Sequence, residues 1–254
     1  MRLLLLILLL TPATLWAEAP RVLFDQGHRQ AFFIERQGLL KLSSLAEVMR
    51  DQGWQVASSQ QPLDDQLLAG VSALIISGPF QSFSSAEIDS IISFVEQGGR
   101  LAIMLHINQT LLPLLHRLGV DAGNLVINEQ QNQIDGKTID FKVTNFVPHP
   151  LTEGLEQFSI YGGWPLQVFA PPGETLASSS PHSWVDLDQN RQLSQQDLMQ
   201  PFAVLIAGEL GQGSFAVFAD DAIFQNQFLS DGNRRLAINL ARWLLGSKGV
   251  QLKI

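Results

Sequence analysis

Polar side chains that can bind a ligand or move a proton follow four short apolar segments of this chain. The segments end near residues 25, 77, 105 and 219. If they are neighbouring parallel strands, their carboxyl ends meet at one edge of a sheet, where open α/β sheets bind ligands. The residues predicted to gather there are Asp25, His28, Ser77, Gly78, His106, Asn108, Asp220 and Asp221.

This set of residues has three interpretations. It could line a polar ligand pocket, or it could form a hydrolytic or metal site, because carboxylates and imidazoles serve as acids, bases and metal ligands. It could also be structural, capping helices and satisfying loop backbone groups. A triad built on Ser77 is not favoured, because no Gly-x-Ser-x-Gly turn surrounds this serine. The catalytic interpretation would use Asp25, His28, His106 and Asp220.

Residues 186–197 form a second candidate site, for calcium. Oxygen-bearing side chains recur in this segment at the spacing of a calcium loop, which surrounds the cation with about six to eight oxygens. Arg191 stands where such loops carry glycine, and Asp197 replaces the usual glutamate, so binding would be weak and structural. The alternative is a metal-free loop of Asx turns. The candidate ligands are Asp186, Asp188, Asn190, Gln192 and Asp197, and no other cofactor is predicted.

Short apolar runs that alternate with amphipathic segments predict the elements that position these residues. The clearest is a helix that begins at Ser84, where Glu87 completes a capping box, and ends at Gly98. Strands that alternate with helices predict a mostly parallel sheet with helices on both faces. Strands are predicted at 21–25, 54–57, 71–76, 101–105, 202–207 and 214–219, and further helices around 42–49, 110–118 and 236–244.

The middle of the chain has a different pattern. Residues 120–170 lack helical periodicity and contain short alternating segments, which predict β-rich additions to the edge of the sheet. Residues 171–199 are rich in Ser, Pro, Gln and Asp and are predicted to form a loop. We therefore expect one domain over residues 18–254, with a β-rich insertion at about 120–200, in preference to two domains.

Several segments resemble one known group of proteins. Residues 73–79 and 100–109 are similar to the third and fourth strands of class I glutamine amidotransferase-like proteins. Residues 149–155 are similar to a segment of non-canonical amidotransferase-like proteins, which include the trehalose-utilisation type and the auxiliary component of gliding-motility ABC transporters. Residues 180–184 and 218–226 resemble segments of that transporter-auxiliary group, so the chain resembles a non-catalytic exported branch. The resemblance implies a flavodoxin-like three-layer α/β sandwich, and it informs the fold far more than the function.

The chain departs from the catalytic members of that group. Met104 occupies the place of their nucleophilic cysteine, and the chain contains no cysteine. A thioether has no proton to lose, so it cannot act as the nucleophile of a thioester mechanism. Leu151 stands after His149 and Pro150 where the orienting carboxylate would be. Glutamine hydrolysis is therefore not expected.

The N-terminus predicts export. One arginine and an unbroken apolar run precede small residues at Ala13 and Ala17, which is the layout of a signal peptide over residues 1–17. An uncleaved anchor is the alternative. No later apolar run is long enough to span a membrane, so we expect a periplasmic or secreted protein. The lack of cysteine also excludes disulfides and a lipoprotein anchor.

Composition limits the partners. With 46% hydrophobic and 16% charged residues, the 254-residue chain is globular, and its formal net charge is −8. It has no basic stripe, so nucleic acid is not an expected partner. We expect a non-catalytic binding or assembly module with a protein or small-molecule partner, for instance in an envelope transport or surface-organisation system. The alternatives are a hydrolase, with or without a metal, and a scaffold whose inserted β region contacts a partner.

Overall fold

The computed structural model describes residues 19–246, so the predicted signal peptide lies outside the described residues. The fold is a mixed α/β arrangement around a ten-stranded sheet, with two small additional sheets. Five strands pair in parallel in the order β2-β1-β3-β4-β16. They are β1 (Arg21–Asp25), β2 (Gln55–Ser59), β3 (Ala73–Ser77), β4 (Arg100–Met104) and β16 (Gly213–Phe218).

The remaining strands extend the sheet beyond β16. β15 (Ala203–Leu210) runs antiparallel to β16, and both β11 (Leu166–Val168) and β12 (Gly173–Ser178) run antiparallel to β15. β5 (Val120–Ala122) and β9 (Asn145–Phe146) complete the edge. Because β11 and β12 share the direction of the five parallel strands, the sheet is mostly parallel, as the sequence predicts.

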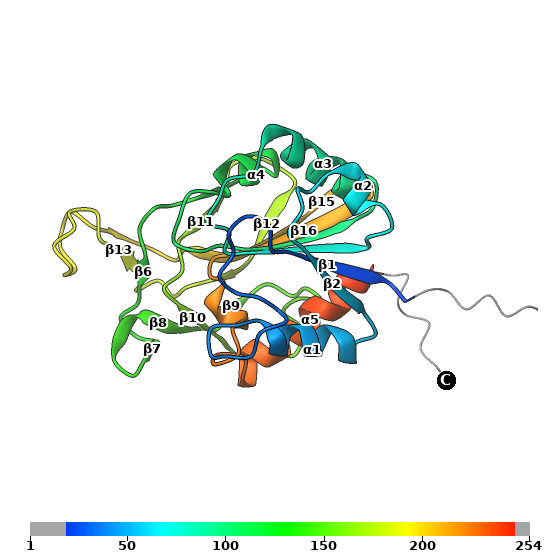
Figure 1. Ribbon diagram of the computed structural model, residues 1–254. Helices are drawn as coiled ribbons and strands as arrows, with labels where there is room; N and C mark the ends of the chain where they lie inside the picture. The colour runs from blue at the N-terminus through cyan, green and yellow to red at the C-terminus, as the bar shows by residue number, and fades with distance from the viewer. Residues whose placement is uncertain (1–18, 247–254) are drawn as a thin grey trace, which may run out of the picture.

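Helices cover both faces of the sheet and give three layers (Figure 1). α2 (Asp65–Leu68), α3 (Ser85–Glu96) and α4 (Leu112–Arg117) lie on one face, and α1 (Ser43–Asp51) and α5 (Asp231–Leu245) on the other. In the described part of the chain, no helix combines the length and the apolar character needed to cross a membrane.

Local sequence signals explain α3 well. The predicted capping box at its start is present: the Ser84 side chain accepts a hydrogen bond from the Glu87 backbone, and the Glu87 side chain accepts one from the Ser84 backbone. Its predicted apolar face is buried against the sheet, and consists of Ile88, Ile91, Ile92 and Val95. The four-residue α2 was not predicted, because it is shorter than the apolar repeat that identifies a helix.

The middle of the chain is β-rich, but only part of it extends the central sheet. One small sheet has the order β10-β8-β7 and the other β14-β13-β6. Residues 171–199, predicted to form a loop, contain β12, whose Leu176 and Ala177 are buried while its polar residues face outward. That prediction was wrong for β12 and for the two-residue strands β13 and β14, which lie in the same range. The strands of the small sheets are β6 (Ile127–Asn128), β7 (Gln133–Ile134), β8 (Lys137–Val143), β10 (Phe158–Tyr161), β13 (Trp184–Val185) and β14 (Leu198–Met199).

A hairpin projects from the β-rich region. We call residues 184–199 the arm: it comprises β13, β14 and the loop between them, and it extends away from the three layers (Figure 1). Trp184 and Val185 are buried at its base, whereas Leu187, Leu198 and Met199 are largely exposed.

Candidate functional site

A cavity of about 400 Å³ opens beside the carboxyl ends of β4 and β16. We call it the strand-end cavity. Three of the predicted site residues, His106, Asp220 and Asp221, line it. The other walls are mainly apolar and aromatic, and include Phe32, Leu40, Ile107, Ile139, Tyr161 and Phe228.

His106 and Asp221 form a hydrogen-bonded pair in this cavity. The His106 Nδ1 lies 3.2 Å from the Asp221 Oδ1. The imidazole is flanked by the rings of Phe32 and Phe80, with centroids 5.7 and 4.9 Å away. The hydrogen bond with Asp221 raises the pKa of His106 although burial opposes this, so the protonated imidazole is favoured.

Asp220 is buried beside this pair. Its carboxyl group accepts hydrogen bonds from the backbone N–H groups of Tyr161 (2.7 Å) and Ala222 (2.8 Å). Burial and the neighbouring Asp221 nevertheless raise the pKa of Asp220 to about 8. Burial also raises the pKa of Asp221, against the effect of His106. Burial therefore favours the neutral form of both carboxyl groups in the cavity.

Two buried acceptor atoms at the cavity have no hydrogen-bond partner among residues 19–246. They are the Asp221 Oδ2 and the Gln225 Oε1. Both atoms are buried within the protein, and the Asp221 Oδ2 lies against Gly78, so they belong to lining residues without being exposed to the cavity itself. Gln225 was not predicted as a site residue. It follows the short 3-10 helix η1 (Ala222–Phe224), which turns the chain back towards the cavity after β16.

Gly78, which directly follows Ser77 at the end of β3, lies against the Asp221 carboxyl group. Gly78 has φ +52°, and a Cβ atom there would lie 2.1 Å from the Asp221 Oδ2. Only glycine allows this backbone conformation and this close approach together. The buried Ser77 Oγ has no hydrogen-bond partner among the described residues.

Asp25 and His28 form a separate cluster at the end of β1. The His28 Nδ1 lies 2.9 Å from the Asp25 Oδ2, and its Nε2 lies 3.0 Å from the Glu87 Oε1. The ring stacks on Phe83 at 3.8 Å. Burial lowers the pKa of His28, but the hydrogen bonds and charges of Asp25 and Glu87 outweigh it and raise the pKa. No hydrogen bond within the described residues joins this cluster to His106 or Asp220.

The remaining strand-end residue, Asn108, has local partners. Its Nδ2 donates to the Pro79 carbonyl at 3.0 Å, and its Oδ1 accepts from the Thr110 backbone at 3.1 Å. These bonds join the loops after β3 and β4. The eight predicted residues thus divide into a group at the strand-end cavity and others that hold loops together.

The arm loop brings together Asp186, Asp188 and Asp197, whose carboxylates lie within 4.8 Å of one another. In the described chain this is the one group of acidic, histidine or cysteine residues with the spacing of a metal site. Its carboxylates also accept hydrogen bonds from loop amides, as expected of Asx turns; Arg191 N, for example, donates to Asp186 at 2.7 Å. Arg191 has φ +64°, the conformation that glycine adopts in calcium loops.

Asn190, another predicted calcium ligand, forms hydrogen bonds within the same loop. The Asn190 Nδ2 donates to Asp188 at 2.8 Å, and its Oδ1 accepts from the Gln192 backbone at 2.7 Å. Calcium at this loop stays a prediction beside the metal-free alternative.

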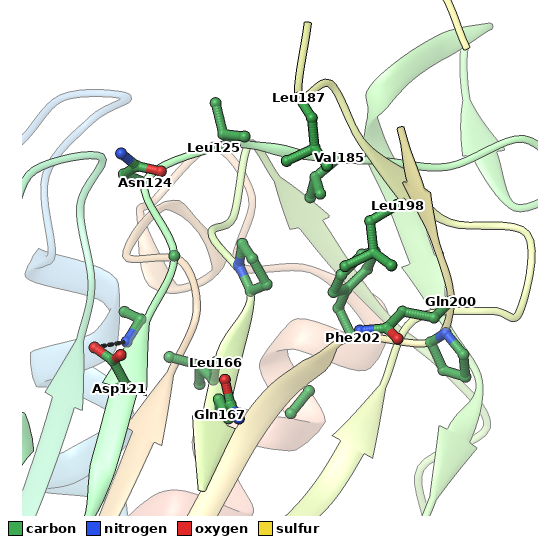
Figure 2. A pocket seen from close by; sticks show the side chains of 15 residues that line it. Asp121, Asn124, Leu125, Leu166, Gln167, Val185, Leu187, Leu198, Gln200 and Phe202 are labelled. Carbon is green, nitrogen blue, oxygen red and sulfur yellow. Dashed lines mark hydrogen bonds between the residues drawn. The ribbon is translucent and has the colours of Figure 1, made fainter. Parts of the chain in front are cut away.

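A second cavity, of about 440 Å³, lies between the arm and the strands β5, β11 and β15 of the large sheet. Figure 2 shows Leu125, Leu187 and Leu198 around its opening and Phe202 deeper inside. We call it the arm cavity. The sequence did not predict it, because it forms between segments that are far apart in the chain.

A family model described as a domain of unknown function, DUF4350, matches residues 42–241. A search of curated proteins finds no match.

Solved structures share the fold at low sequence identity. The mmIFT52 N-terminal domain is 18% identical with a TM-score of 0.72, covering 92% of this chain and 100% of that chain. The cytoplasmic protein STM1381 of Salmonella typhimurium LT2 is 16% identical with a TM-score of 0.57, covering 88% and 99%. A ThuA-like protein of Bacteroides uniformis is 17% identical with a TM-score of 0.53, covering 93% and 96%.

Proposed function

The chain belongs to the DUF4350 family, and we propose that it is a non-catalytic module that binds a small molecule in the strand-end cavity. The observation that carries this proposal is the pairing of mainly apolar walls with the His106–Asp221 pair and Asp220 in one cavity. A concave, mostly apolar pocket with a few convergent polar groups of shifted pKa is typical of ligand sites.

Within residues 19–246, neither of the two nucleophile positions considered, Met104 and Ser77, is activated, which supports a non-catalytic role. Met104, at the place of the amidotransferase cysteine, is fully buried. A serine nucleophile needs a base within about 2.6–3.2 Å, and the Ser77 Oγ has no partner in the described chain.

Hydrolysis remains the alternative. The His106–Asp221 pair has the form of a base with its orienting carboxylate, which could act on water without a protein nucleophile. Ligand turnover that is lost on His106→Ala would favour this alternative over the binding module.

We also propose that the protein is an exported, amidotransferase-like member of the flavodoxin-like folds. The strand order β2-β1-β3-β4-β16 supports this fold, because it matches the flavodoxin order 2-1-3-4-5. The predicted signal peptide supports a periplasmic or secreted location. The sequence resemblance points to an envelope transport or surface-organisation system as the context.

Assembly with a protein through the arm is a second candidate function. Leu187, Leu198 and Met199 are 53%, 43% and 46% exposed, so the arm presents apolar surface beside a cavity. Exposed apolar groups that gather on one feature are typical of interaction sites.

A thermal-unfolding screen of amines, carboxylic acids, sugars and nucleotides tests the proposed function, because ligands of the folded state raise Tm. Leu40→Trp narrows the cavity, since Leu40 lines it and is half exposed. Leu39→Trp is the matched control, because Leu39 is exposed and does not line it. We expect compounds that raise Tm of the wild type and Leu39→Trp but not of Leu40→Trp.

Two results would contradict the proposal: no compound of any class raises Tm, or the Tm shifts survive Leu40→Trp unchanged. Shifts that survive Leu40→Trp and disappear in Leu187→Ser would move the site to the arm cavity.

A further inference from the structure

The charges at the strand-end cavity balance one another. Asp140 lies 3.3 Å from the Lys137 ammonium group, and Asp221 is bonded to the imidazole of His106. Asp220 has no ion pair among the described residues: it accepts hydrogen bonds from two backbone N–H groups, and its burial favours the neutral form. The cavity therefore offers neither a cation nor an anion a counter-charge that is not already compensated.

His106 and Asp221 share one proton in the uncharged state of the pair. If the imidazole holds this proton, its Nδ1–H donates to the Asp221 carboxylate; if the carboxyl group holds it, the O–H donates to Nδ1. In both arrangements the other ring nitrogen, Nε2, carries its own hydrogen. The Nε2 becomes an acceptor only after the pair has lost the shared proton and carries a negative charge.

The Nε2 of His106 is accessible to a ligand. It has no hydrogen-bond partner among the described residues, and it is not one of their buried unpaired atoms. The imidazole lines the cavity, is 26% exposed, and lies between the rings of Phe32 and Phe80. Asp221 holds Nδ1 on the buried side of the ring. The pair therefore provides one accessible and oriented hydrogen-bond donor at the cavity.

The walls define the rest of the ligand. Tyr161 and Phe228 stack with ring centroids 3.7 Å apart, and Leu40, Ile107 and Ile139 line the cavity while about half of each side chain stays exposed. These groups can bury hydrocarbon when a ligand covers them. A cavity of about 400 Å³ suits a small molecule and falls within the usual range of about 300–1,000 Å³.

We propose that the strand-end cavity selects an uncharged molecule with an apolar body and a hydrogen-bond acceptor, and that the His106 Nε2 donates to this acceptor. This inference rests on the proposed function, because it names the ligand class of the same cavity. A carbonyl oxygen meets the requirement, since it accepts a hydrogen bond without carrying a charge. A carboxylate or an ammonium group would lose its hydration without gaining a counter-charge, which is unfavourable.

The shared proton gives the ligand a dependence on pH. Asp221 and Asp220 are the charged groups that act on His106, and both favour its protonation. Asp140 and Tyr161 are the other titratable groups among the lining residues. Once a rising pH removes the shared proton, Nε2 becomes an acceptor and repels the acceptor of the ligand. Binding of an uncharged acceptor should therefore weaken at high pH.

Isothermal titration with 4-phenylbutan-2-one, 3-phenylpropanoate and 4-phenylbutan-2-amine tests the ligand class. The three compounds have nearly the same shape and are respectively neutral, anionic and cationic. We expect the ketone to bind at least about 10-fold more tightly than either ion, because the cavity does not replace the hydration that the ions lose. The same titration at rising pH should show the ketone binding progressively more weakly.

Nitrogen NMR of the imidazoles reports on the proposed donor directly. The chain has five histidines, and the signals of His106 are those missing from His106→Phe. We expect the ketone to shift the Nε2 resonance of His106 in the wild type. The resonances of His116, which does not line the cavity, should stay unchanged.

Variants connect the affinity to His106. His106→Phe keeps a ring beside Phe32 and Phe80 but removes the donor, and we expect it to weaken ketone binding about 10-fold. His116→Phe is the matched control and should bind the ketone as the wild type does. Circular dichroism shows whether each variant is folded. If His106→Phe is not, the Nε2 shift of the wild type decides.

The outcomes separate the two proposals. Binding of either ion as tightly as the ketone, lost in Leu40→Trp, would overturn the inferred ligand class and support the cavity as a site. No binding of the ketone at millimolar concentration would also overturn the inference, and the library screen would then judge the binding function alone. Ketone binding without a shift of the His106 Nε2 would overturn the role of His106.

Discussion

Single residues carry most of the chemistry at the strand-end cavity. Asp221 bonds to His106, approaches the backbone of Gly78 and leaves one oxygen unpaired. The position of the Asp221 side chain depends on Gly78, because the carboxylate can lie there only where the neighbouring residue has no Cβ atom.

Gly78→Ala tests this dependence. An alanine at this position would be strained in the left-handed backbone conformation, and its Cβ atom would collide with Asp221. We therefore expect the free energy of unfolding to fall by about 2–4 kcal/mol. Gly136→Ala is the matched control: its φ is +72° and nothing lies within 4 Å of the added atom. It should cost about 1 kcal/mol. Urea unfolding measures both, and equal costs would contradict the proposed contact.

Asp220 predicts a pH dependence with a definite sign. Because its pKa in the folded state is raised to about 8, the folded state holds the proton more tightly than the unfolded state. The contribution of Asp220 to the free energy of unfolding is therefore greatest at low pH, and it falls as the pH rises from about 4 to about 8.

Asp220→Asn should remove this decline. Relative to wild type, the variant should gain up to about 1.4 kcal/mol per pH unit across that range, even though it loses a backbone hydrogen bond at every pH. The exposed Asp51→Asn serves as control. Parallel stability curves for wild type and Asp220→Asn, measured by urea unfolding, would refute the raised pKa.

Among the elements, β1 and α3 are linked by His28. Its ring bonds to Asp25 after β1 and to Glu87 in the first turn of α3. Since the pKa of His28 is raised, this contribution is fully present below about pH 6.5 and is lost as the pH rises through the folded-state pKa.

His28→Ala should therefore cost more stability at pH 6 than at pH 9. We expect about 3 kcal/mol at pH 6, because the buried Asp25 and the partly buried Glu87 lose their shared cation. His116→Ala, which breaks an exposed pair with Asp121, should cost less than about 1 kcal/mol at both values. A cost for His28→Ala that is independent of pH would indicate packing on Phe83 alone.

The arm loop has two open interpretations that one melting experiment separates. The calcium interpretation predicts that millimolar calcium raises Tm and that Asp186→Ala with Asp188→Ala abolishes the rise. The Asx-turn interpretation predicts no calcium dependence and a similar Tm with and without a chelator.

The helices and strands differ in how well the sequence predicts them. The strands from β1 to β4 and helix α3 were predictable because their signals are local: apolar runs, a capping box and terminal glycines. Strand β12 could not be predicted, because its two buried residues lie in a polar segment and the strand forms by pairing with β15, which follows later in the chain.

At the site, strand ends were predictable and contacts were not. The carboxyl ends of parallel strands share one edge, so His106 and Asp220 could be placed together from sequence. The contact between His28 and Glu87 could not be predicted, because the two residues are 59 positions apart and Glu87 was expected only in a capping box. Gln225 escaped prediction because no motif marks it, and its role appears only once η1 turns it towards the cavity.

For the whole molecule, the position of the cavity is the main finding. In sheets of this order, the crevice is expected where the order reverses, between β1 and β3. Here His28, stacked on Phe83 and bonded to Glu87, occupies the end of β1. The cavity lies instead beside β4 and β16, where the β-rich region supplies Ile139 and Tyr161 as an additional wall.

Hydrogen–deuterium exchange with the tightest ligand from the screen tests this location most directly. Peptides that cover residues 104–108 and 219–228 should exchange more slowly when the ligand is bound, because these segments line the strand-end cavity. Peptides of the arm, residues 184–199, should not change. Protection confined to the arm, with none at residues 104–108 or 219–228, would contradict the account.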